Sequence, residues 1–94
     1  MAELYHVQGK IAEAEQLLLR ALTIWEQVGS LHPGKATSLS NLAFIYEIQG
    51  KYAEAELFYT QALVIYEQQL GPTHPHTKRV RLNYTSLLRR IGRT

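Results

Sequence analysis

Apolar residues recur along this chain at spacings of three and four positions, which places them on one face of a helix. The pattern appears in four stretches, with polar residues between the apolar positions. Stripes of this kind predict helices that pack against one another, so we expect an all-α protein. The four stripes are Ile11, Ala14, Leu18, Ala21, Leu22 and Trp25; Leu39, Leu42, Ala43 and Tyr46; Tyr52, Ala55, Tyr59, Ala62, Leu63 and Tyr66; and Val80, Tyr84, Leu87, Leu88 and Ile91.

Glycine and proline mark the ends of the helices. Gly9 and Gly50 stand where a helix can end in a left-handed residue, a conformation that glycine adopts at little cost. Pro33 and Pro75 suit the first turn of a helix, where a missing N–H costs nothing. These positions predict five helices, near residues 2–8, 10–28, 33–49, 51–69 and 75–91.

The sequence repeats itself with a period of 41 to 42 residues. Between residues 8–27 and 49–68, twelve of twenty positions are identical. A second marker, His32-Pro33, returns as His74-Pro75, 42 positions later. Self-similarity at this period is typical of arrays in which each two-helix unit buries its apolar face against its neighbours.

Composition excludes several kinds of chemistry. The 94 residues contain no Cys and no Asp, so disulfides and thiolate metal sites are excluded. No Gly-rich phosphate loop is present, and the Ser and Thr residues are scattered along the chain without the pattern of a nucleophile and its base. The four His residues lack carboxylates at ligand spacing, and the His-Pro pairs fit helix starts better than a metal site. We expect no enzymatic activity, no cofactor and no metal.

The chain shows no sign of a targeting or membrane segment. Its first residues have neither a basic region nor an apolar run, so we expect no secretory signal. No uninterrupted apolar run is longer than residues 42–46, which is far shorter than the roughly 20 residues of a membrane helix. We therefore expect a soluble, cytoplasmic protein with no membrane partner.

Charge is distributed unevenly. Residues 1–74 hold eight Glu against four Lys and Arg, a net charge of −4. Residues 75–94 hold six Lys and Arg and no acid, a net charge of +6. The basic last helix could contact nucleic acid, but the acidic remainder of the chain would oppose wrapping of the nucleic acid. Nucleic-acid binding is therefore the least favoured function.

The repeat resembles the tetratricopeptide repeat, and more narrowly its 42-residue variety found in kinesin light chains. The resemblance implies a right-handed superhelix of antiparallel helix pairs, a helical-hairpin solenoid, over residues 1–94. Within it we expect a truncated first repeat at 1–31, a complete repeat at 32–72 and a closing helix at 73–94. The residues that carry the resemblance are His32-Pro33, Asn41-Leu42-Ala43, Tyr46, Gln49-Gly50-Lys51-Tyr52, Glu54-Ala55-Glu56, Tyr59 and Ala62-Leu63.

By this resemblance, the first helix of each unit lines a concave groove that binds a peptide segment of a partner protein. We expect the groove to be lined by Thr37, Ser40, Asn41, Phe44, Ile48, Arg79, Asn83, Arg89 and Arg90. Further outward positions are Glu3, His6, Val7, Glu47, Leu82 and Ser86.

Three features of the groove suggest its chemistry. Asn41 and Asn83 occupy the same repeat position, and a carboxamide can pair with the backbone of an extended peptide; the alternative is a bridge to a neighbouring helix or to water. Arginines near Asn83 favour an acidic segment or a terminal carboxylate, unless that helix is merely solvated. Phe44 and Ile48 either form an apolar pocket or touch a neighbouring helix.

Self-association is a second hypothesis for the function. The short first helix leaves apolar surface around Ile11, Leu18 and Leu22 partly uncovered, and such patches favour association. In that case the chain is a structural segment of a longer array, and it forms a homodimer through its terminal repeat. Trp25 and Tyr66, at equivalent positions, are expected to serve packing.

Overall fold

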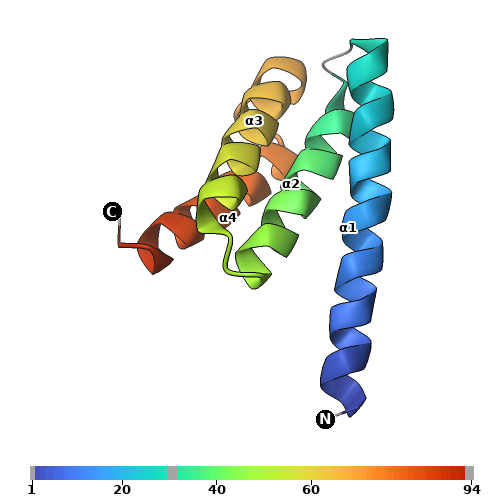
Figure 1. Cartoon of the computed structure of the whole chain (residues 1–94). Helices are drawn as coiled ribbons and strands as arrows, with labels where there is room; N and C mark the ends of the chain where they lie inside the picture. The colour runs from blue at the N-terminus through green and yellow to red at the C-terminus, as the bar shows by residue number, and fades with distance from the viewer. Residues whose placement is uncertain (1, 30–31, 93–94) are drawn as a thin grey trace.

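Four helices stack in the order of the sequence (Figure 1). The structure is a computed structural model that describes residues 2–29 and 32–92, with side chains described from residue 9 onward. The helices are α1 (Ala2–Val28), α2 (Pro33–Ile48), α3 (Tyr52–Leu70) and α4 (Pro75–Arg90). α2 packs between α1 and α3, and α4 packs against α3. Within the described ranges there is no strand, so the predicted all-α class is confirmed.

The prediction of a helix break at Gly9 is wrong. α1 runs without interruption from Ala2 to Val28, and Gly9 lies inside it. Gly50, by contrast, has φ 81° and ends α2, as predicted. A glycine permits a turn without requiring one, because it costs a helix interior only about 1 kcal/mol relative to alanine. The expected helices 2–8 and 10–28 are therefore one helix.

The His-Pro pairs begin helices, as predicted. Pro33 and Pro75 each occupy the first turn. The preceding histidines cap these turns with their side chains, a role that was not predicted from the sequence. Nδ1 of His32 accepts a hydrogen bond from the N–H of Gly34 at 2.9 Å, and Nδ1 of His74 accepts one from the N–H of His76 at 3.1 Å. Each histidine thereby satisfies one of the free N–H groups at its helix start.

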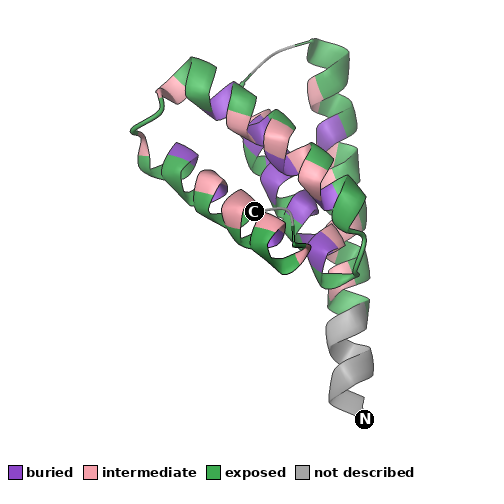
Figure 2. Ribbon diagram, turned by 90° about the vertical axis from the view of Figure 1, so that its left-hand side faces the viewer, coloured by how far each residue is buried: buried purple, intermediate pink, exposed green. Residues whose placement is uncertain are grey.

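The core lies on both sides of α3, where it meets α2 and α4. Four residues of the stripe predicted for α3 are confirmed as core, since Ala55, Tyr59, Ala62 and Tyr66 are each 0–1% exposed. Leu63 is half-buried, and the prediction is wrong for Tyr52, which is 37% exposed at the start of α3. Figure 2 shows the buried residues on the sides of the helices that face one another. In the described part of α1, Leu22 is the one buried hydrophobic residue, so the prediction of partly uncovered apolar surface is wrong for Leu22. Ile11 and Leu18 are half-buried, as that prediction expects.

Candidate functional site

One face of α2 carries a stripe of exposed side chains. Thr37, Asn41, Phe44 and Ile48 are spaced by four, three and four residues, which places them on one side of the helix. Phe44 is 54% exposed and Ile48 is 52% exposed, although both are large and apolar. The outward orientation predicted for these four residues is confirmed. Glu3, His6 and Val7 lie outside the described side chains.

Thr37 also has a structural contact at the edge of this stripe. Its hydroxyl donates to the carbonyl of Pro33 at 3.1 Å and lies 2.6 Å from the hydroxyl of the buried Tyr66. Because the Thr37 proton is directed to Pro33, Tyr66 is the donor in the second bond. Tyr66 therefore serves packing, as predicted. Trp25, at the equivalent position, stacks on His32 with ring centroids 4.8 Å apart.

Two residues predicted to point outward from α2 are buried instead. Ser40 is 7% exposed, and its hydroxyl donates to the carbonyl of Thr37. Glu47 is 8% exposed. Both lie in a second stripe with Ala36 and Ala43, on the side of α2 that faces α3. α2 has neighbours on two sides, so the side chains next to its exposed stripe are covered.

Glu47 joins three helices. The Tyr59 hydroxyl on α3 donates to its Oε1 at 3.1 Å, and Nη1 of Arg90 on α4 lies 2.9 Å from its Oε2. Burial raises the pKa of the Tyr59 hydroxyl well above its usual value, and the Glu47 carboxylate raises this pKa further. This cluster was not predicted from the sequence, although the spacing of Glu47 from the small residues Ser40 and Ala43 was a signal that it faces α3.

α4 presents a corresponding exposed stripe. Arg79, Asn83 and Arg90 are exposed, as predicted, and Ser86 is exposed between them. The ion pair between Arg90 and Glu47 brings the C-terminal ends of α2 and α4 together, so the two exposed stripes are neighbours there. We call these two stripes the α2–α4 face.

Arg89 lies to one side of the α2–α4 face. It is exposed as predicted, but it shares a helix side with Lys78 and Leu82, and Leu82 is 69% exposed. Arg81 points elsewhere: it pairs with Glu67 at 3.0 Å and also donates to the carbonyl of Pro72. The basic residues of α4 are therefore divided among three sides of the helix.

Two hollows, the first of them mainly apolar, follow the boundary between α1 and α2. One, of about 400 Å³, is lined by Ala14, Leu17, Leu18, Asn41, Phe44 and Ile45. The next, of about 320 Å³, is lined by Ile11, Ala12, Ile48 and Gln49. Phe44 and Ile48 therefore remain exposed while they line hollows shared with α1.

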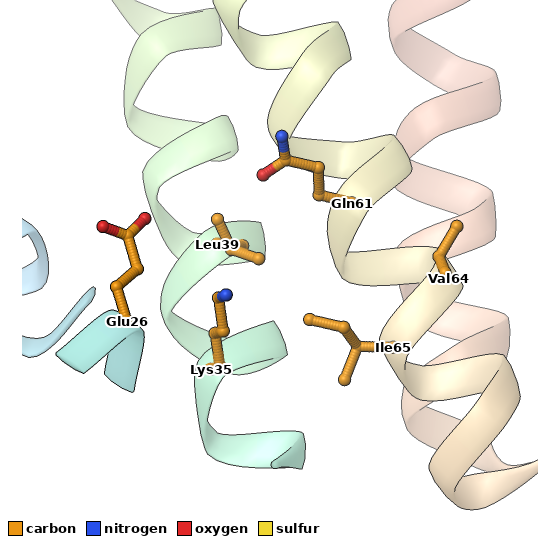
Figure 3. Close-up of a pocket in the computed structure, with 6 residues that line it drawn as sticks. All are labelled: Glu26, Lys35, Leu39, Gln61, Val64 and Ile65. Carbon is orange, nitrogen blue, oxygen red and sulfur yellow. The ribbon is translucent and has the colours of Figure 1, made fainter. Parts of the chain in front are cut away.

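A third hollow, of about 380 Å³, lies among α1, α2 and α3 (Figure 3). Leu39, Val64 and Ile65 supply apolar side chains, and Glu26, Lys35 and Gln61 supply polar ones. Leu39 and Asn41 are two residues apart, which is roughly 200° around a helix. This hollow is therefore on the side of α2 opposite the α2–α4 face.

The described residues show neither a membrane helix nor a metal cluster. Among the described helices, none has both the length and the apolar character needed to cross a membrane. Over the same residues, no three side chains of His, Cys, Asp or Glu come together as metal ligands would.

The stacked helices and the internal repeat define a helical-repeat protein. A family model described as the tetratricopeptide repeat matches residues 1–68. The chain belongs to the tetratricopeptide repeat family. Repeats of this family are typically non-catalytic modules that mediate protein–protein interaction. A search of curated proteins found no match.

Proposed function

We propose that this chain binds a peptide segment of a partner protein along the α2–α4 face. The observation that supports the proposal best is the exposure of two aligned stripes that combine carboxamides, apolar side chains and arginines. Asn41 and Asn83, 42 positions apart, would pair with backbone groups of an extended peptide. Phe44 and Ile48 would hold an apolar side chain of the peptide.

The proposed peptide is acidic at the end that lies over α4. Arg79 supplies an exposed guanidinium there, and Arg90 remains 60% exposed while it pairs with Glu47. A guanidinium binds a carboxylate through two parallel hydrogen bonds, so an acidic side chain or a terminal carboxylate fits this end of the face.

Three finer statements belong to the same proposal. The units are of the 42-residue variety seen in kinesin light chains, since both His32-Pro33 and the helix-ending Gly50 recur 42 positions later, as His74-Pro75 and Gly92. The helix pairs continue as a right-handed superhelix, and the α2–α4 face is its concave side. The chain acts in the cytoplasm as a scaffold or adaptor.

Selection from a displayed random peptide library tests the proposal. Enrichment of acidic or C-terminal peptides on the unaltered chain is expected. The double substitution Asn41→Ala and Asn83→Ala should weaken the selected peptides about tenfold or more, because each lost hydrogen bond is worth about 1 kcal/mol. The matched control is Gln61→Ala with Gln68→Ala, which removes two exposed carboxamides from α3. Equal binding by both double variants, or no enrichment at all, would contradict the proposal.

Self-association is the second candidate function. It is favoured by one specific observation, the exposed apolar side chains on α1, among them Leu17 at 62% and Ile24 at 60%. Contiguous apolar surface of this kind commonly marks an interface. On this reading the chain is an assembly segment that forms homodimers or longer assemblies.

A further inference from the structure

The repeat allows each helix side to be compared with its equivalent one unit later. Ala14, Leu18, Ala21 and Trp25 on α1 correspond to Ala55, Tyr59, Ala62 and Tyr66 on α3, 41 positions on. On α3 these side chains are 0–1% exposed because α2 covers them. On α1 all four are only half-buried.

Ile24 shows the difference most sharply. Its equivalent is Ile65, the same residue type in the same repeat position. Ile65 is 4% exposed, whereas Ile24 is 60% exposed. Leu17 and Val28, which are 62% and 65% exposed, lie on the same side of α1 as Ile24. α1 therefore carries a side shaped for a preceding unit, and no helix of the described residues covers it.

α4 likewise has a side that no following helix covers among the described residues. On α2, the stripe of Ala36, Ser40, Ala43 and Glu47 is buried under the helix that follows, α3. Its equivalent on α4, 42 positions later, is Lys78, Leu82, Thr85 and Arg89. Leu82 is 69% exposed. α4 also ends as α2 does, since Gly92 with φ 75° matches Gly50 with φ 81°. α4 is therefore a complete first helix, and no second helix covers it within residues 2–29 and 32–92.

We propose that these two surfaces bind each other in separate copies of the chain, so that α4 of one copy docks between α1 and α2 of the next. The contacts that α2 makes within one chain supply the template. Tyr46 stacks on Phe58 with ring centroids 5.5 Å apart, and Glu47 meets Tyr59. Shifted by one unit, Leu88 falls on Leu17 of the next copy and Arg89 falls beside Leu18 of that copy.

Charge favours this head-to-tail arrangement over two like surfaces meeting. α4 carries five Lys and Arg and no acid, whereas residues 1–74 have a net charge of −4. Contact between two copies of α4 would bring like charges together. Head-to-tail contact places the basic α4 against α1, whose residues 2–28 hold four Glu against Lys10 and Arg20, a net charge of −2. On the exposed side of α1, Glu13 and Arg20 both lie next to Leu17.

This inference rests on the self-association proposal and gives it two defined surfaces, and it is independent of peptide binding. An interface between two different surfaces does not close by itself, so it builds chains or rings rather than a symmetric dimer. Wild-type protein should therefore grow in mass with concentration.

Two half-interface variants test the arrangement by sedimentation velocity over a concentration series. Leu82→Glu damages only the α4 surface, and Ile24→Glu damages only the α1 surface. Both residues are exposed within one chain, so both variants should fold, which circular dichroism checks. Each substitution should weaken association more than about tenfold, since buried apolar anchors dominate interfaces.

An equimolar mixture of the two variants should form a 1:1 heterodimer and nothing larger, because one intact interface remains. Leu57→Glu, an exposed site on α3 outside both surfaces, is the matched control and should associate like wild type.

The outcomes separate the two proposals. A wild-type chain that is monomeric at every concentration would overturn both self-association and the head-to-tail arrangement. Association that survives Leu82→Glu, or that is lost with Leu57→Glu, would overturn the head-to-tail arrangement alone. So would failure of the two half-interface variants to form a heterodimer.

Discussion

Two glycines in identical local sequence adopt different conformations. Gly9 and Gly50 both stand in the sequence Gln-Gly-Lys, yet Gly9 is helical and Gly50 has φ 81°. The local sequence therefore does not determine whether the chain turns at the glycine. After Gly50, α3 folds back on α2 and buries Ala55 and Tyr59 completely. Tertiary packing of α3 on α2 favours the turn at Gly50.

Alanine substitutions at the two glycines should change stability in opposite directions. Gly50→Ala should lower the free energy of unfolding by about 1–2 kcal/mol, because a left-handed residue with a Cβ is strained. Gly9→Ala should raise it by about 0.5–1 kcal/mol, because alanine is the better helix former. Urea denaturation measures both. A Cβ at either position would meet no atom within 4 Å, so steric clashes do not confuse the comparison. Similar losses from both substitutions would mean that the chain turns at Gly9 as well.

The sequence predicted the features that spacing alone determines. Three- and four-residue periodicity predicted the stripes that pack the helices, and Pro33 and Pro75 predicted two helix starts. The burial of Ser40 and Glu47 was missed because exposure on α2 depends on its contacts with both α1 and α3. Histidine side-chain capping was missed because histidine is not a usual capping residue. The site residues were therefore predicted best where no helix covers the side chain, as at Asn41 and Phe44.

At the scale of the helices, Glu47 connects α2, α3 and α4 through one carboxylate. A buried carboxylate is costly unless it has partners, and here Tyr59 donates to one oxygen and Arg90 pairs with the other. The cluster fixes the C-terminal end of α4 against α2. It therefore also sets the relation of the two stripes of the α2–α4 face.

Tyr59→Phe should weaken this joint and change the response to alkali. At neutral pH the free energy of unfolding should fall by about 1–3 kcal/mol, because a buried acceptor loses its donor. The pKa of Tyr59 is raised in the folded chain, so its contribution to stability is complete below the unfolded pKa of about 10 and is lost as pH rises above it. Denaturant midpoints across the alkaline range should therefore fall less steeply in the variant than in wild type.

Two comparisons check the assignment to Tyr59. Tyr52→Phe alters an exposed tyrosine and should leave neutral stability nearly unchanged. Some alkaline loss should persist in Tyr59→Phe, because burial also raises the pKa of Tyr46. Identical alkaline profiles for wild type and Tyr59→Phe would show that ionisation of Tyr59 does not contribute to the loss of stability at high pH.

At the scale of the whole molecule, the helices of the stack are buried to different extents. α2 contributes eight buried residues, including Leu39 and Leu42 at 0–1% exposure, whereas Leu22 at 7% is the one buried hydrophobic residue in the described part of α1. In a linear array each helix is stabilised by its immediate neighbours, so a helix covered on one side is the least stable. α1 is in that position.

Hydrogen exchange should reveal this gradient. Amides of residues 11–26 in α1 should exchange at least about tenfold faster than those in the middle of α2 and α3, because local opening of α1 exposes little buried surface. Dilute protein is the right starting condition, since docking of α4 from another copy would cover α1. Raising the concentration should then slow exchange in α1 of wild type and leave it unchanged in Leu82→Glu. Uniform protection of all four helices in dilute protein would mean that α1 belongs to the same cooperative unit as the core, and that its exposed apolar side chains do not weaken it.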